Sequence, residues 1–150
     1  VAHVALFQSL IGTPDWSLFT TEPDQKACCH NTVPIGAESG PIFSVPYDFD
    51  VSGIVNTRYA DRLFAPETRD MGIRRVRERA YRGFCASASH LPELFALFNQ
   101  KREAIYATYR TQPGLDPEVV KETVEYLDAF YDTINDPKKV ERELSRKCVE

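Results

Sequence analysis

The character of the sequence changes near Gly72, and this change constrains the fold more than any other feature. Residues 1–71 are irregular and rich in Gly, Pro and Asp, whereas residues 72–150 repeat apolar residues at the three- and four-residue intervals of amphipathic helices. At 150 residues the chain is long enough for one core. We therefore expect a single α+β domain over residues 1–150 that is mainly helical, with the functional groups in 1–71 and a helical scaffold in 72–150.

Apolar spacing and helix-end signals place the helices. Gly12 should end the first helix, because glycine readily takes the left-handed conformation that closes a helix. Asp116 and Asp136 each precede a proline, which pairs an N-capping carboxylate with a residue suited to the first helical turn. The predicted helices span residues 1–11, 73–83, 91–109 and 117–134, and a further one begins at 137.

Two short β-prone runs lie in the irregular part. Thr32–Ile35 and Ile42–Val45 are separated by Gly36–Gly40, a stretch typical of a hairpin turn. The second run leads through Pro46 and Tyr47 directly into an acidic segment. We therefore expect a small β-hairpin that carries the functional site.

The acidic segment contains two carboxylates, Asp48 and Asp50. Mg²⁺ and Mn²⁺ prefer oxygen ligands, and Mg²⁺ is usually held by one or two protein carboxylates together with phosphate oxygens. Residues two apart on an extended chain share a face, so the pair suits such an ion. The alternative is that both aspartates form turns by accepting hydrogen bonds from nearby backbone N–H groups.

Two further polar residues precede the hairpin. Asp15 follows the first predicted helix, and Asn31 stands just before the first β-prone run. Kinase-type phosphotransfer uses an aspartate to orient the attacking hydroxyl or accept its proton, and uses Asn and Asp to hold metal ions that bridge the nucleotide phosphates. The order Asp, Asn, hairpin, Asp therefore predicts a catalytic role for Asp15 and a metal site on Asn31, Asp48 and Asp50.

Four segments of the chain resemble a group of largely uncharacterised bacterial proteins, which is more distantly similar to the spore-coat CotH-like atypical kinases and to HipA-like kinases. They are residues 10–17, 28–31, 46–53 and 76–83. The resemblance implies the C-terminal lobe of a kinase-like fold, with ATP and Mg²⁺ (or Mn²⁺) as cofactors. It gives Asp15 the role of the catalytic-loop aspartate, and it gives Asn31 and Asp48 the metal- and nucleotide-binding roles.

The chain also departs from the protein-kinase pattern. The gap between Asp15 and Asn31 is longer, no lysine follows Asp15 by two positions, and the metal-binding motif continues with Asp50 rather than glycine. A general base must lie within hydrogen-bond reach of its proton. Asp24 and His30 are therefore alternatives for the position that the resemblance gives to Asp15.

The sequence contains no Gly-rich loop and no strand-borne lysine to hold nucleotide phosphates. The chain opens directly in a helical pattern at Val1, so we expect a fragment that is inactive without an upstream N-terminal lobe. The predicted function is metal- and ATP-dependent phosphotransfer. One alternative is a kinase-like binding or structural domain that has lost catalysis. Another is a phosphatase of the haloacid-dehalogenase type with Asp48 as nucleophile, which would need βα repeats after Gly72.

Charge and hydropathy exclude some classes of binding partner. The chain has 18 basic and 22 acidic residues and a net charge of -4, which argues against general affinity for nucleic acid or anionic membranes. No apolar run approaches the roughly 20 residues that span a bilayer. The expected partners are a nucleotide and an unknown phosphate acceptor. A periplasmic or secreted location requires an upstream signal peptide, and otherwise the protein is expected in the cytoplasm.

The four cysteines are Cys28, Cys29, Cys85 and Cys148, and their spacing matches neither a zinc ribbon nor a CxxC redox motif. In an oxidising compartment we expect a disulfide from Cys28 or Cys29 to Cys85. The alternative is that the cysteines are buried free thiols.

Overall fold

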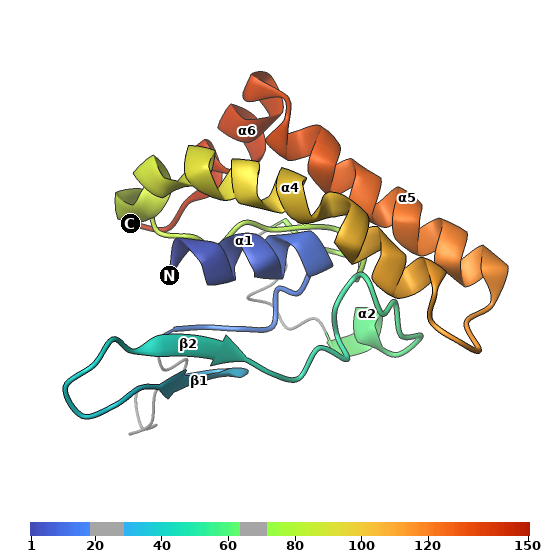
Figure 1. Cartoon of the computed structure of the whole chain (residues 1–150), viewed down its shortest axis with the longest axis horizontal. Helices are drawn as coiled ribbons and strands as arrows, with labels where there is room; N and C mark the ends of the chain where they lie inside the picture. The colour runs from blue at the N-terminus through green and yellow to red at the C-terminus, as the bar shows by residue number, and fades with distance from the viewer. Residues whose placement is uncertain (19–28, 64–71) are drawn as a thin grey trace. The chain divides into compact units, whose positions relative to one another are not determined.

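The computed structural model describes residues 1–18, 29–63 and 72–150 (Figure 1). The protein is α+β, with helices and a small antiparallel hairpin, as expected. The chain forms two compact units. We name the first, Val1 with Gly12–Ala80, the hairpin unit, and the second, Ala2–Ile11 with Tyr81–Glu150, the helical unit.

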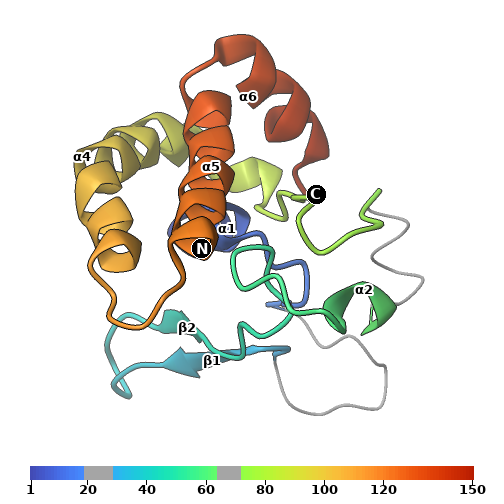
Figure 2. The same ribbon diagram turned by 90° about the vertical axis from the view of Figure 1, so that its right-hand side faces the viewer.

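The helical unit contains the helices predicted over residues 1–11, 91–109 and 117–134 and the one predicted to begin at 137. Helices α4 and α5 lie side by side (Figures 1 and 2), and α1 packs against both. No helix among the described residues is long and apolar enough to span a membrane. The elements are α1 (Ala2–Ile11), the 3₁₀ helix η1 (Cys85–His90), α4 (Leu91–Arg110), α5 (Pro117–Ile134), α6 (Pro137–Glu143) and the 3₁₀ helix η2 (Ser145–Lys147).

The predicted end signals operate as expected. Gly12 takes φ 67° directly after α1, a conformation that costs glycine little. The Asp116 carboxylate accepts the backbone N–H of Glu118 at 2.8 Å and so caps α5. The Asp136 carboxylate accepts the N–H of Lys138 at 2.8 Å and caps α6. Both caps satisfy backbone donors that a helix leaves without a partner at its start.

Aromatic rings fill the space between α4 and α5. Phe130 and Tyr131 of α5 are almost fully buried, and their ring centroids lie 5.4 Å apart in an edge-to-face arrangement. Phe98 of α4 packs on Phe130 at 5.8 Å, and Tyr106 packs edge-on against Tyr131 at 5.7 Å. These contacts make the apolar stripes of the two helices a common core.

A polar cluster borders this core. The Arg102 guanidinium donates to the Asp128 carboxylate at 2.6 Å and lies 4.8 Å from the centre of the Tyr131 ring. The Tyr106 hydroxyl donates to the same carboxylate oxygen of Asp128. Burial, and then the hydrogen bond to Asp128, raise the pKa of Tyr106 to about 12. The cluster therefore ties α4 to α5 through a phenol that stays protonated.

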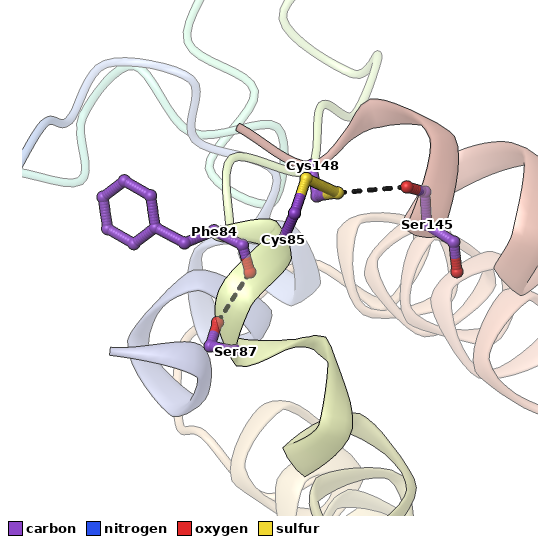
Figure 3. Close-up of a disulfide and its surroundings, with 5 residues drawn as sticks. All are labelled: Phe84, Cys85, Ser87, Ser145 and Cys148. Atoms are coloured by element: carbon purple, nitrogen blue, oxygen red, sulfur yellow. Dashed lines mark hydrogen bonds between the residues drawn. A yellow bond between two sulfur atoms is a disulfide. The ribbon is translucent and has the colours of Figure 1, made fainter. Parts of the chain in front are cut away.

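A disulfide joins Cys85 to Cys148 (Figure 3). The two segments that carry it also pair, because Cys85 N–H donates to Val149 O and Val149 N–H donates to Gly83 O, each at 2.9 Å. The Cys148 sulfur lies 3.1 Å from Ser145 O; as a disulfide sulfur it carries no hydrogen, so this is a contact rather than a hydrogen bond.

The predicted disulfide from Cys85 to Cys28 or Cys29 is therefore wrong, and so is the alternative of free thiols at Cys85 and Cys148. Cys29 is also disulfide-bonded, and its partner lies outside the described residues. Sequence spacing alone could not reveal that the start of η1 meets the end of the chain.

The hairpin unit contains the predicted hairpin. Strands β1 (Thr32–Ile35) and β2 (Phe43–Pro46) pair antiparallel, with Val33 opposite Val45 and Ile35 opposite Phe43. The second strand begins and ends one residue later than expected. Each strand contains a proline, Pro34 in β1 and Pro46 in β2. Proline cannot donate to a β-ladder, so both edges resist the addition of a further strand.

The core of the hairpin unit is formed by the loop after β2, the short helix α2 (Ala60–Leu63) and the chain after Gly72. Val51, Ala60, Ile73 and Val76 are buried together, and Ala80 packs against them. This cluster anchors the loop that carries the acidic segment.

The helix expected over residues 73–83 does not form. Two carboxylates accept the backbone N–H groups of this segment in place of helical carbonyls: Glu78 accepts from Arg74 at 2.6 Å, and Asp61 accepts from Val76 at 2.6 Å. Side-chain acceptors of this kind compete with helix formation. Ile73 and Val76 are buried as predicted, but from an irregular chain.

Candidate functional site

The segments of Asp15 and Asn31 are paired in the hairpin unit. Ser17 N–H donates to His30 O at 2.9 Å, and His30 N–H donates to Ser17 O at 3.0 Å. The buried Asn31 side chain then reaches Asp15, with Nδ2 donating to the Asp15 backbone oxygen at 2.8 Å and to its Oδ2 at 3.0 Å. Because both donors of this amide face Asp15, Oδ1 of Asn31 is left as the atom that can bind a cation.

His30 contacts the other oxygen of the same carboxylate. Its Nε2 lies 2.7 Å from Asp15 Oδ1, and the two side chains are 46% and 42% exposed. Nε2 donates to the Asp15 carboxylate when the imidazole carries a hydrogen on this nitrogen. Asp15 is thus oriented by His30 on one side and by Asn31 on the other.

Asp48 follows β2 and turns out of the strand. Tyr47 N–H donates to Asn31 O at 3.1 Å, which extends the hairpin pairing by one step. Asp48 then adopts φ 57°, and Asn31 adopts φ 49°. This left-handed region is uncommon for residues other than glycine but is enriched in Asn and Asp. Two of the three residues predicted to bind metal therefore lie at the same end of the hairpin, Asn31 just before β1 and Asp48 just after β2, and each has a positive φ.

Asp48 interacts electrostatically with the other two carboxylates. Hydrogen bonding with the Asp50 side chain raises the pKa of Asp48 most; the charge of Asp50, partial desolvation and the charge of Asp15 add to the rise. Like charges disfavour a second ionisation nearby. Asp48 therefore lies close enough to Asp50 and Asp15 for both to act on its protonation.

Asp50 is held by the loop that follows it. Tyr59 OH donates to Asp50 Oδ2 at 2.7 Å, and Thr57 Oγ1 donates to the Asp50 backbone oxygen at 2.9 Å. The bond from Tyr59 is the main reason that the pKa of Asp50 is lowered, and the same bond raises the pKa of the Tyr59 phenol. Asp50 is accordingly the more acidic member of the pair.

These residues fit a hard divalent cation only in part. Among the described residues, no three His, Cys, Asp or Glu side chains could hold a metal ion by themselves. A magnesium site usually needs fewer protein carboxylates, because waters and substrate phosphates complete it. The donor set of Asn31 Oδ1, Asp48 and Asp50 is an all-oxygen set of this kind, and it matches Mg²⁺ or Mn²⁺ better than zinc.

The segments that contain Asp15, Asn31 and Asp50 each contain a buried hydroxyl group as well. Thr13, Thr32 and Ser52 stand within two residues of Asp15, Asn31 and Asp50 respectively, and each is at most 3% exposed. Their hydroxyl oxygens have no hydrogen-bond partner in the described part of the chain. Buried hydroxyls without a partner are costly and are commonly satisfied by ordered water.

The structure joins Asn31 to Asp15 by hydrogen bonds, and Asp48 interacts with Asp50 and with the charge of Asp15. Asp15, Asn31, Asp48 and Asp50 all lie in the hairpin unit, and the interactions above connect each to at least one other. Asp24 lies outside the described residues. The sequence carried no signal for Tyr59, because its link to Asp50 depends on how the intervening loop folds.

No protein-family model, curated protein or solved structure matches the chain. The functional assignment therefore rests on the chemistry of the site.

Proposed function

We propose that this chain is part of a metal- and ATP-dependent phosphotransferase of an atypical, kinase-like type. The observation that carries the proposal is the double hydrogen bond from Asn31 to Asp15, and it is supported by the influence of Asp50 and Asp15 on the pKa of Asp48. One oxygen-rich cluster thus contains a candidate base and candidate cation ligands, which are the groups that phosphoryl transfer requires.

Each residue has a distinct role in this proposal. Asp15, oriented by Asn31 and His30, accepts the proton of the attacking hydroxyl as that oxygen forms its bond to the γ-phosphorus of ATP, while the bond from this phosphorus to the bridging oxygen breaks and ADP leaves. Asn31 Oδ1 and the carboxylates of Asp48 and Asp50 hold the divalent cation. When bound, the cation neutralises charge on the nucleotide phosphates.

The second candidate function is a kinase-like domain that binds nucleotide or metal without catalysis. One observation favours it: both carboxylate oxygens of Asp15 already accept a contact, from His30 and from Asn31. A catalytic Asp15 must release or share the His30 contact when the acceptor hydroxyl arrives. The phosphatase alternative remains a sequence prediction, and the described part of residues 72–150 contains helices with no strand between them.

Metal binding by the 150-residue chain is the direct test. Calorimetric titration with Mn²⁺ and with Mg²⁺, with and without ATP, should show saturable binding to the wild type. Asp48→Asn should weaken it by at least about tenfold, since loss of even an outer-shell partner often costs that much. Asp132→Asn, an exposed change on α5 in the helical unit, is the matched control. Unchanged binding by Asp48→Asn would show that the metal role is wrong.

Phosphate transfer separates the two candidate functions. Transfer of labelled γ-phosphate from ATP, in a protein that also carries any upstream residues, supports the phosphotransferase and should be lost on Asp15→Asn. Binding of Mn²⁺ and ATP without transfer supports the non-catalytic domain.

The disulfides bear on location. Disulfides persist in oxidising compartments and are rare in the cytosol. The bond between Cys85 and Cys148, together with a disulfide-bonded Cys29, supports the periplasmic or secreted alternative. Protein extracted from cells under thiol-blocking conditions should therefore carry these cysteines in unalkylated, oxidised form.

A further inference from the structure

Two side chains of the loop after Asp50 donate hydrogen bonds to this residue. Thr57 binds its backbone oxygen and Tyr59 binds its carboxylate. Asp50 itself is exposed, so without these bonds its side chain would sample several rotamers in water. The Tyr59 bond therefore selects one orientation of a carboxylate that burial does not restrain.

The backbone that presents Tyr59 is anchored. Gly53 N–H donates to Gly12 O at 2.9 Å, and Ala60 N–H donates to Thr57 O at 3.2 Å. Ala60, next to Tyr59, is fully buried with Val51 in the core cluster of the hairpin unit. The Tyr59 phenol is thus a fixed donor rather than a freely moving surface group.

The bond is also selective within the acidic pair. The Tyr59 hydroxyl donates to Asp50, and Asp50 interacts in turn with the Asp48 carboxyl group. A donor to one carboxylate stabilises its charged form.

We propose that Tyr59 is a positioning residue, which holds the Asp50 carboxylate beside Asp48 so that the pair can bind one divalent cation. The inference rests on the proposed metal-dependent function and adds a residue to its site. Outer-shell donors of this kind orient metal ligands and are usually needed for full affinity.

Tyr59→Phe tests the inference, because it removes the hydroxyl and keeps the ring. Tyr59 is 46% exposed, so the variant should fold and melt like the wild type. Calorimetric titration with Mn²⁺ should show about tenfold weaker binding. Tyr47→Phe is the matched control: Tyr47 is 51% exposed and adjoins Asp48 in sequence, yet its loss should leave the affinity unchanged.

A double-mutant cycle shows whether Tyr59 affects Mn²⁺ affinity through Asp50. If Tyr59 acts through Asp50, Tyr59→Phe should have no further effect on Mn²⁺ affinity in an Asp50→Asn background. Equal Mn²⁺ affinity of wild type and Tyr59→Phe, or an undiminished loss in the Asp50→Asn background, overturns the role of Tyr59 while the metal site stands. Absence of Mn²⁺ binding by the wild type, or full binding by Asp48→Asn, overturns the proposed function and this inference with it.

Discussion

At the scale of single residues, Gln8 is the clearest energetic liability of the helical unit. It lies on α1, it is 1% exposed, and neither atom of its amide has a partner in the described part of the chain. A buried polar group without a partner costs about 1–3 kcal/mol. We therefore expect Gln8→Met, which has a similar size, to raise the free energy of unfolding by about 1–2 kcal/mol.

Urea unfolding followed by circular dichroism measures this change. Gln100→Met on α4 is the matched control, because Gln100 is exposed and its replacement should change stability by less than about 0.5 kcal/mol. A clear loss of stability in Gln8→Met would mean that a water molecule or another polar group satisfies the amide.

Residue types and their order were sufficient to name candidate residues for the site. Asp15, Asn31, Asp48 and Asp50 follow from the chemistry that oxygen ligands and bases must supply. The contacts of His30 and Tyr59 could not be predicted in this way. Tyr59 reaches Asp50 because the chain between them turns at Ser52–Asn56. In this turn Asn56 N–H donates to Ser52 O at 3.0 Å. The sequence around Tyr59 does not indicate that this turn brings Tyr59 to Asp50.

At the scale of elements, the sequence predicted the helices and the hairpin whose formation depends on neighbouring residues. Periodicity and capping identified α1, α4 and α5, and β-propensity with a glycine-bounded turn identified the hairpin to within one residue. The prediction failed for residues 73–83, where apolar spacing was correct but Asp61, fifteen residues earlier, binds the backbone N–H of Val76. A contact of that separation overrides local propensity, and single-sequence spacing does not contain it.

The α4–α5 pair should make stability sensitive to alkaline pH through Tyr106. Its pKa rises from 10.0 to about 12 in the folded protein. Between these values the unfolded chain loses this proton and the folded chain keeps it, so folded molecules bind more protons and stability falls as pH rises. We expect the decline between pH 10 and 12 to be shallower in Tyr106→Phe than in the wild type.

Urea unfolding at several pH values measures this slope. At pH 8 the variant should also be about 1–2 kcal/mol less stable, because the hydrogen bond to the Asp128 carboxylate is lost. Tyr47→Phe, with an exposed phenol, controls for the simple removal of a tyrosine. Parallel pH slopes for wild type and Tyr106→Phe would contradict the shifted ionisation.

At the scale of the whole molecule, covalent pairing was the feature that sequence predicted least well. Two cysteines that bond must come within a few ångströms, and that depends on the complete path of the chain. Cys85 and Cys148 meet because Gly83–Cys85 pairs with the chain around Val149. Cys28 and Cys29 are closer to Cys85 in sequence, but sequence separation is no guide to that distance.

The Cys85–Cys148 bond should dominate the stability of the helical unit. It closes a loop with a sequence separation of 63 residues, and the chain-entropy relation gives about 4 kcal/mol of stabilisation for a loop of that length. We expect Cys85→Ser with Cys148→Ser to lower the free energy of unfolding by about 2–5 kcal/mol in urea. Reductant should destabilise the wild type by at least that amount. Its effect on the double variant isolates the contribution of the disulfide at Cys29. A double variant as stable as the oxidised wild type would mean that α1, α4 and α5 hold the unit together without the cross-link.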